Sequence, residues 1–272
     1  MAYHGHNQRA SFATRGPIGA ITRGTTNSNR LRRCDRWMRY NLEIQQLLLH
    51  ADAPLAIDVG YGASHTTTCQ WARWLRQIRP DIAVLGLEIH PDRVLPPRDG
   101  VEFALGGFEL AGHRPHLVRA WNVLRQYDVA QVEQAWATVT RNMADGGRFI
   151  EGTCDELGRR ATWITLTQDG PETLTLAWDP QTLARPSDIA ERLPKALIHC
   201  NTEGFAIHAV LKQLDQAWLA AAATAPFGPR FRWQATLQLL AEQGLPFRHP
   251  RRAIRDNLIT LDWSLVNGRI SG

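Results

Sequence analysis

The sequence contains no hydrophobic run long enough to cross a membrane. No apolar stretch approaches the roughly 20 residues that span a bilayer, and the N-terminus lacks the apolar centre of a secretory signal. The chain has 272 residues, of which 44% are hydrophobic, so it can bury a full core. We therefore expect a cytoplasmic protein that makes no membrane contact and folds as one large domain, with or without appendages.

Cysteine and histidine are too scattered to indicate a metal centre or a disulfide framework. The four cysteines include no C-x-x-C pair, and they stand far apart at Cys34, Cys69, Cys154 and Cys200. Reduced structural thiols are the simplest interpretation. His4 and His6 supply only a two-ligand fragment near the start of the chain. The sequence therefore predicts no metal site.

Acidic residues are absent from the first 33 positions, which carry six arginines and no lysine. The rest of the chain holds 25 basic and 26 acidic residues, so the formal charge of +5 comes from this end. Residues 1–30 also lack apolar periodicity, which predicts a flexible basic arm. Its segment 23–33 could act as an arginine-rich clamp over a ligand or an RNA, or simply as a solubilising tail. The nearly neutral body does not favour a broad RNA-binding face.

Apolar runs alternate with helical patterns through the middle of the chain. Helices are predicted at 29–52, 64–80 and 128–143, and buried strands at 54–60, 82–88, 100–107, 115–124 and 146–153. This alternation predicts parallel strands joined by helical crossovers. Two further runs, 161–168 and 172–178, flank a turn and predict an antiparallel hairpin.

The fold predicted from these runs is a doubly wound α/β domain. It has a mostly parallel, seven-stranded, Rossmann-like sheet with helices on both faces. Residues 31–272 are assigned to this single domain, which includes an added helical segment at about 186–244. The final alternating run, 257–266, predicts a half-buried strand of the same domain.

Two glycines follow the first predicted strand, in the pattern Asp58-x-Gly60-x-Gly62-x-Ser64. Glycine tolerates positive φ and allows a ligand to approach the backbone closely. Glu88 ends the second strand, and the carboxyl ends of neighbouring parallel strands meet at one edge of the sheet. The carboxylate of Glu88 can accept two hydrogen bonds from ribose hydroxyls. The pattern predicts a nucleotide-type cofactor at this edge.

The segments DVGYGAS and LGLEIHPDRV resemble the nucleotide-binding half of class I S-adenosylmethionine-dependent methyltransferases, over residues 55–153. The resemblance implies S-adenosyl-L-methionine as cofactor, with its amino-acid end at the glycine turn and its ribose at Glu88. The interval from Asp58 to Glu88 is longer than usual for that family, and Ser64 stands at the third glycine position. The residues assigned to cofactor binding are Asp58, Gly60, Tyr61, Gly62, Glu88, Gly107, Phe108 and Asn122, although Phe108 could equally be a core residue.

Polar residues after the fourth and fifth strands are the candidates for catalysis. The resemblance implies that the residues after the fourth strand lie between the methyl group of the cofactor and the acceptor. Asn122 can orient an acceptor by hydrogen bonding, whereas Glu151, Asp155 or Glu156 could serve as a general base. We assign catalytic roles to Asn122, Tyr127 and Asp155. An ordinary role as polar loop residues is an equally good interpretation.

Several catalytic motifs are missing, which narrows the chemistry. Methyl transfer from a sulfonium is an in-line displacement that needs no covalent enzyme intermediate. This agrees with the absence of a G-x-S-x-G elbow, a P-loop lysine and the Pro-Cys dipeptide of cytosine-5 methyltransferases. The acceptor, whether a small molecule, a protein or an RNA group, is not identified.

Two other functions are open. One is an NAD(P)-dependent Rossmann oxidoreductase, although a third glycine and a Tyr-x-x-x-Lys pair are absent. The other is a catalytically inactive binding module that keeps the cofactor fold.

Overall fold

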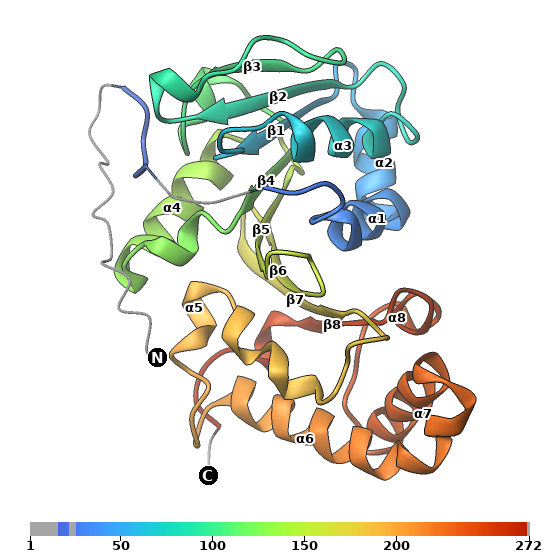
Figure 1. Cartoon of the computed structure of the whole chain (residues 1–272). Coiled ribbons are helices and arrows are strands. Elements are labelled where there is room, and N and C mark those ends of the chain that lie inside the picture. The colour runs from blue at the N-terminus through green and yellow to red at the C-terminus, as the bar shows by residue number, and fades with distance from the viewer. Residues whose placement is uncertain (1–15, 22–25, 271–272) are drawn as a thin grey trace.

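The computed structural model describes residues 16–21 and 26–270, and these form an α/β structure around one mixed sheet (Figure 1). The strand order is β3-β2-β1-β4-β5-β6-β7-β8. The strands are β1 (Leu55–Val59), β2 (Ala83–Glu88), β3 (Glu102–Leu105), β4 (Leu117–Trp121), β5 (Arg148–Cys154), β6 (Arg160–Thr167), β7 (Gly170–Trp178) and β8 (Leu258–Asp262).

The parallel part of the sheet agrees with the sequence, but the strand count does not. Strands β1 to β5 are parallel to one another, as predicted. The predicted hairpin is present as β6 and β7, which are antiparallel because a two-residue turn can join only antiparallel strands. The chain then adds β8 beside β7, with Leu174 opposite Leu261. The sheet of the described residues is therefore mixed and has eight strands, so the predicted count of seven was wrong.

Helices lie on both sides of the parallel strands (Figure 1). They are α1 (Arg32–Tyr40), α2 (Leu42–His50), α3 (Thr66–Leu75), α4 (Val129–Asn142), α5 (Lys195–Ile198), α6 (Ala206–Ala220), α7 (Pro229–Glu242) and α8 (Pro250–Asp256). Helices α1 to α3 gather on one side and α4 on the other, while α5 to α8 lie beyond β7 and β8 (Figure 1). Within the described ranges, no helix combines the length and apolarity needed to cross a lipid bilayer.

The single helix predicted at 29–52 is interrupted at Asn41. This residue has ψ of 121°, outside the helical range, and its side-chain oxygen accepts a hydrogen bond from the backbone N–H of Ile44. Asparagine caps helix starts well because its short side chain reaches the free donors of the first turn. The predicted helix is therefore two helices, α1 and α2, which are separated at Asn41.

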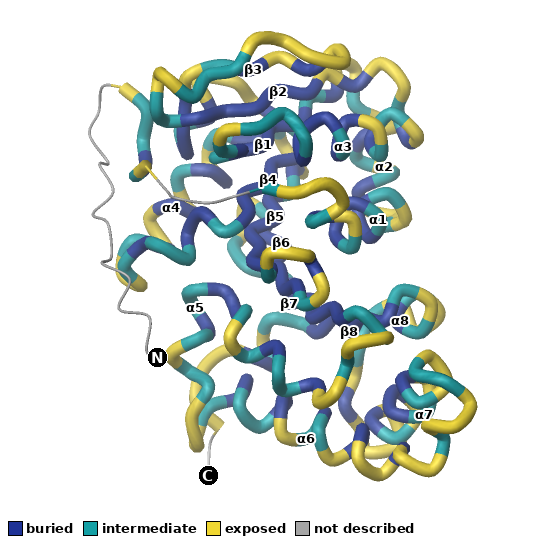
Figure 2. Tube along the Cα trace, viewed as in Figure 1, coloured by how far each residue is buried: buried dark blue, intermediate teal, exposed yellow. Residues whose placement is uncertain are grey.

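The core runs through the sheet and its covering helices without a break (Figure 2). Buried apolar residues extend from Leu31 to Val266. The last strand is buried from Leu258 to Leu261, so the prediction of a half-buried strand was wrong. Helix α8 packs against β8, and Trp136 of α4 meets Trp263, the residue that follows the strand.

The predicted arm lies only partly within the described residues. Residues 16–21 and 26–30 both contact the body of the fold. Arg30 donates from Nε to the carbonyl oxygen of Asp155 at 2.9 Å, and Ile18 packs against the core. The division of the chain into an arm, one domain and a helical insertion stays a prediction.

Candidate cofactor site

The glycine turn after β1 has the backbone conformation that the sequence predicts. Gly60 and Gly62 have φ of 70° and 82°, values that side chains rarely allow. A Cβ atom on Gly60 would lie 2.7 Å from Val123 Cγ2, so this position also lacks room for a side chain. A Cβ on Gly62 would meet nothing within 4 Å. The turn is therefore built on glycine for conformation at both positions and for space at Gly60.

Glu88 holds this turn from the end of β2. The buried carboxylate accepts hydrogen bonds from the N–H groups of Gly62, at 3.1 Å, Ile89, at 3.0 Å, and His90, at 3.3 Å. The predicted meeting of glycine turn and acid is thus confirmed. A carboxylate has about four lone-pair positions, and backbone donors use three of them here. The role of Glu88 toward a ribose stays a prediction.

Asp58, in contrast, points its carboxylate into the core. Arg119 donates to both oxygens of Asp58, from Nε at 2.9 Å and from Nη2 at 2.7 Å, and Thr68 donates from Oγ1 at 2.7 Å. Arg119 also donates to Asp35 at 2.7 Å and lies 4.3 Å from the ring centre of Trp71. Through these contacts Asp58 supports the glycine turn from inside the core. Its assignment to cofactor binding stays a prediction.

Tyr61 packs beneath the turn. Its ring meets Phe103 edge to face at 4.8 Å, and its hydroxyl donates to the carbonyl oxygen of Arg93 and accepts from the N–H of Leu95, both at 3.0 Å. The residue fastens the loop after β2 to the glycine turn. Its direct contact with a cofactor stays a prediction.

The turn after β3 carries an acid that the sequence analysis passed over. Glu109 accepts from the N–H of Gly107 at 2.8 Å and from the N–H of Ile18 at 2.6 Å. The N–H of Phe108 donates to the carbonyl oxygen of Ile18 at 2.9 Å. Residues 16–21, here named the strap, therefore lie on Gly107 and Phe108, two of the residues assigned to cofactor binding. An acid directly after Gly-Gly-Phe at the end of a parallel strand is the signal that could have indicated Glu109.

Tyr127 faces Phe108 and the strap. The two rings meet edge to face at 5.7 Å, and the N–H of Ala20 donates to the Tyr127 hydroxyl. Burial raises the pKa of Tyr127 to about 12, although the hydrogen bond from Ala20 acts in the opposite direction. The phenol is therefore neutral at physiological pH. A catalytic role for Tyr127 stays a prediction.

Asn122 and Asp155 occupy the ends of β4 and β5, as predicted, and both are tied to backbone. Asn122 has φ of 59°, and its Oδ1 accepts from the N–H of Cys154 at 2.9 Å. Asp155 accepts from the N–H groups of Leu157, Arg159 and Arg160 in the β5–β6 turn. Both side chains thus shape the rim of the sheet. Their catalytic assignments stay predictions.

Glu151 does not lie at this rim. It is 1% exposed and sits inside β5 between Ala120 and Ile164. Among the residues that the structure describes, neither carboxylate oxygen has a hydrogen-bond partner. Burial raises its pKa to about 8, so the carboxyl is protonated at neutral pH. Its position in mid-strand removes Glu151 from the candidates for a general base at the edge.

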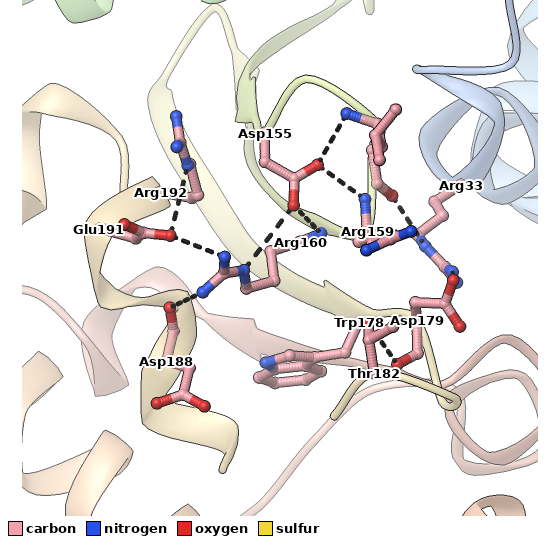
Figure 3. A network of polar contacts seen from close by, with 12 residues as sticks. Arg33, Asp155, Arg159, Arg160, Trp178, Asp179, Thr182, Asp188, Glu191 and Arg192 are labelled. Atoms are coloured by element: carbon pink, nitrogen blue, oxygen red, sulfur yellow. Dashed lines mark hydrogen bonds and ion pairs between the residues drawn. The ribbon is translucent and has the colours of Figure 1, made fainter. Parts of the chain in front are cut away.

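A cavity of about 410 Å³ opens beside the β5–β6 turn rather than above the glycines. Figure 3 shows Arg160 reaching both Asp155, at 3.7 Å, and Glu191, at 3.0 Å, while Arg33 pairs with Asp179 at 3.4 Å. The residues that line this cavity include both acidic and basic side chains. They are, among others, Asp155, Asp179, Asp188, Arg159, Arg160 and Arg185. In the part of the chain that the structure describes, no three histidine, cysteine or acidic side chains are grouped to hold a metal ion.

The chain is similar to known proteins in fold but not in sequence family. No family model and no curated protein matches the chain. Among the solved structures that align with about half of it is a protein of Anaeromyxobacter dehalogenans described as a type II methyltransferase (15% identity, 48% of this chain and 49% of that one, TM-score 0.33). Two others are the magnesium protoporphyrin IX methyltransferase of Synechocystis PCC 6803 with bound S-adenosylmethionine (14%, 50% and 67%, 0.32) and the CcbJ methyltransferase of Streptomyces caelestis (17%, 53% and 75%, 0.33). The chain thus spans about half the length of the first.

Proposed function

We propose that this protein is an S-adenosylmethionine-dependent methyltransferase. The observation that carries the proposal is the hydrogen bond between the Gly62 N–H and the Glu88 carboxylate, which joins a positive-φ turn after β1 to an acid at the end of β2. A ligand with an amino-acid end and a ribose fits this pair, because one member offers a close backbone approach and the other offers acceptors for hydroxyls. S-adenosylmethionine has both parts.

The residues fit the cofactor at three neighbouring strand ends. Gly60 and Gly62 would receive its amino-acid end, Glu88 its ribose, and the turn at Gly107, Phe108 and Glu109 its adenine. The cofactor supplies an electrophilic methyl group on a sulfonium. The rest of the reaction requires an acceptor held in line with the carbon–sulfur bond and shielded from water.

The acceptor is proposed to bind at the ends of β4 and β5. Asn122 stands there with its amide anchored to Cys154, and the charged cavity begins one residue further on, at Asp155. A wall with both signs of charge suits a polar acceptor, whether a small molecule, a protein group or an RNA group. Asp155 or Tyr127 would need to leave its present partners before it could move a proton.

One observation favours the second candidate, a binding module without catalysis. The N–H of Gly60 donates to Leu87, that of Gly62 donates to Glu88, and those of Gly107 and Phe108 have partners too. A cofactor would therefore displace existing contacts in part of this site. No comparable observation favours a nicotinamide-dependent oxidoreductase.

Calorimetric titration of the purified full chain with S-adenosylhomocysteine and, separately, with NADH and NADPH tests the proposal. Saturable binding of S-adenosylhomocysteine alone is the expected result. Binding of a nicotinamide cofactor alone would overturn the proposal in favour of the oxidoreductase. Absence of binding to all three, in the full chain and in a chain without the strap, would favour the module.

A further inference from the structure

The strap makes an unusual pair of hydrogen bonds with the turn after β3. The N–H of Ile18 donates to the Glu109 carboxylate at 2.6 Å, and the carbonyl oxygen of the same residue accepts from the Phe108 N–H at 2.9 Å. The N–H donor and the carbonyl acceptor of Ile18 thus lie side by side and face the turn after β3. The 6-amino group and N1 of adenine present the same order of donor and acceptor.

The strap lies too close to the turn to leave room for a ring between them. A Cβ atom on Gly107 would lie 2.1 Å from the Ile18 carbonyl oxygen. A Cβ atom on Gly19 would lie 3.0 Å from the Tyr127 hydroxyl and 3.1 Å from Ile89 Cδ1. These contacts join the strap to the ends of β2 and β3 and to the segment after β4.

We propose that the strap is an internal competitor of the cofactor, in which the backbone of Ile18 occupies the adenine end of the site. The inference rests on the proposed function, because it takes an adenine-containing ligand as the rival. A base that pairs with Phe108 and Glu109 must first displace Ile18. Displacement also breaks the hydrogen bond from Ala20 to Tyr127. The affinity measured for the full chain is therefore reduced by the free energy of strap docking.

Two variants of the full chain release the strap without replacing any residue assigned to cofactor binding or catalysis. Ile18→Pro removes the N–H that binds Glu109, and Gly19→Leu places a side chain against Tyr127 and Ile89. A third variant deletes residues 1–21. Ile21→Ala is the matched control, because Ile21 belongs to the strap but its side chain is exposed.

The measurement is the calorimetric affinity of each chain for S-adenosylhomocysteine and for adenosine. Loss of two to three hydrogen bonds predicts about tenfold or tighter binding by the releasing variants. Adenosine should gain as much as S-adenosylhomocysteine, because the strap occupies only the adenine end. Ile21→Ala should bind like the unmodified chain. Equal affinity in all chains would overturn the competition and leave the proposed function standing.

Hydrogen exchange separates competition from closure of the strap over a bound cofactor. In the full chain, addition of S-adenosylhomocysteine should speed exchange of the Ile18 and Ala20 amides, which lose their acceptors. Slower exchange at these amides would mean that the strap covers the cofactor, and would overturn the proposal. If the chain without residues 1–21 binds neither ligand, the proposed function fails and the competition fails with it.

Discussion

The guanidinium of Arg119 binds both carboxylate oxygens of Asp58 inside the protein, where both side chains are buried. Burial alone would lower the pKa of Arg119, but the charges of Asp58 and Asp35 raise it. Asp58 lies near the end of β1, and the glycine turn begins two residues later, at Gly60. The ion pair therefore fixes the strand end from which the candidate site is built.

Loss of the Arg119 guanidinium should destabilise the fold strongly. Arg119→Met would leave two buried carboxylates without their cation, a situation that costs about 3–5 kcal/mol. The free energy of unfolding, measured with denaturant, should fall by that amount. Arg73→Met is the control, because Arg73 pairs with Asp99 in an exposed position, where ion pairs contribute about 0–1 kcal/mol. Equal losses in the two variants would contradict this account of the core.

Glu88→Gln should weaken binding of S-adenosylhomocysteine by about 10- to 100-fold, because hydrogen bonds to a charged acceptor contribute about 1.5–3 kcal/mol. Glutamine keeps one acceptor oxygen, but its NH2 group would face an N–H that the second carboxylate oxygen now accepts, so the free energy of unfolding should also fall, by about 1–3 kcal/mol. Calorimetry on a variant shown to be folded provides the measurement. Glu102→Gln, at an exposed position of β3, should bind normally. Unchanged affinity in folded Glu88→Gln would remove Glu88 from the site.

Gly60→Ala should cost more stability than the same substitution at Gly146. The two glycines have almost equal φ, 70° and 71°, so both substitutions meet a strain of about 1–2 kcal/mol. Only Gly60 would also force a Cβ against Val123, which adds about 1–3 kcal/mol, because nothing lies within 4 Å at Gly146. Thermal or denaturant unfolding of both variants gives the comparison. A loss at Gly60 no larger than that at Gly146 would show that Val123 yields without cost.

Glu151 should make stability fall as pH rises. Its pKa is raised to about 8 in the folded protein from an ordinary value of 4.5, so the folded state holds a proton that the unfolded state has released. Between these values the free energy of unfolding should decrease by about 1.4 kcal/mol per pH unit from this group. Glu151→Gln should remove that slope, whereas the exposed Glu156→Gln should keep it. Equal slopes in the two variants would place the effect elsewhere.

The local parts of the site followed from short patterns in the sequence. Gly60 and Gly62 stand directly after a buried run, and Glu88 ends the next one, so parallel pairing of two strands was enough to bring them together. Hydrophobic runs likewise predicted β1 to β5 and the β6–β7 hairpin, because burial on both faces and a two-residue turn leave clear marks in composition.

Long-range partners decided the rest. The sequence by itself determined a glycine turn beside an acid, since both lie at the ends of strands that neighbour each other in order. The tertiary structure alone decided that Asp58 pairs with Arg119, 61 positions away, and that Ile18 reaches Glu109, 91 positions away. No periodicity encodes such pairs, because they depend on which side chains packing brings within hydrogen-bonding distance.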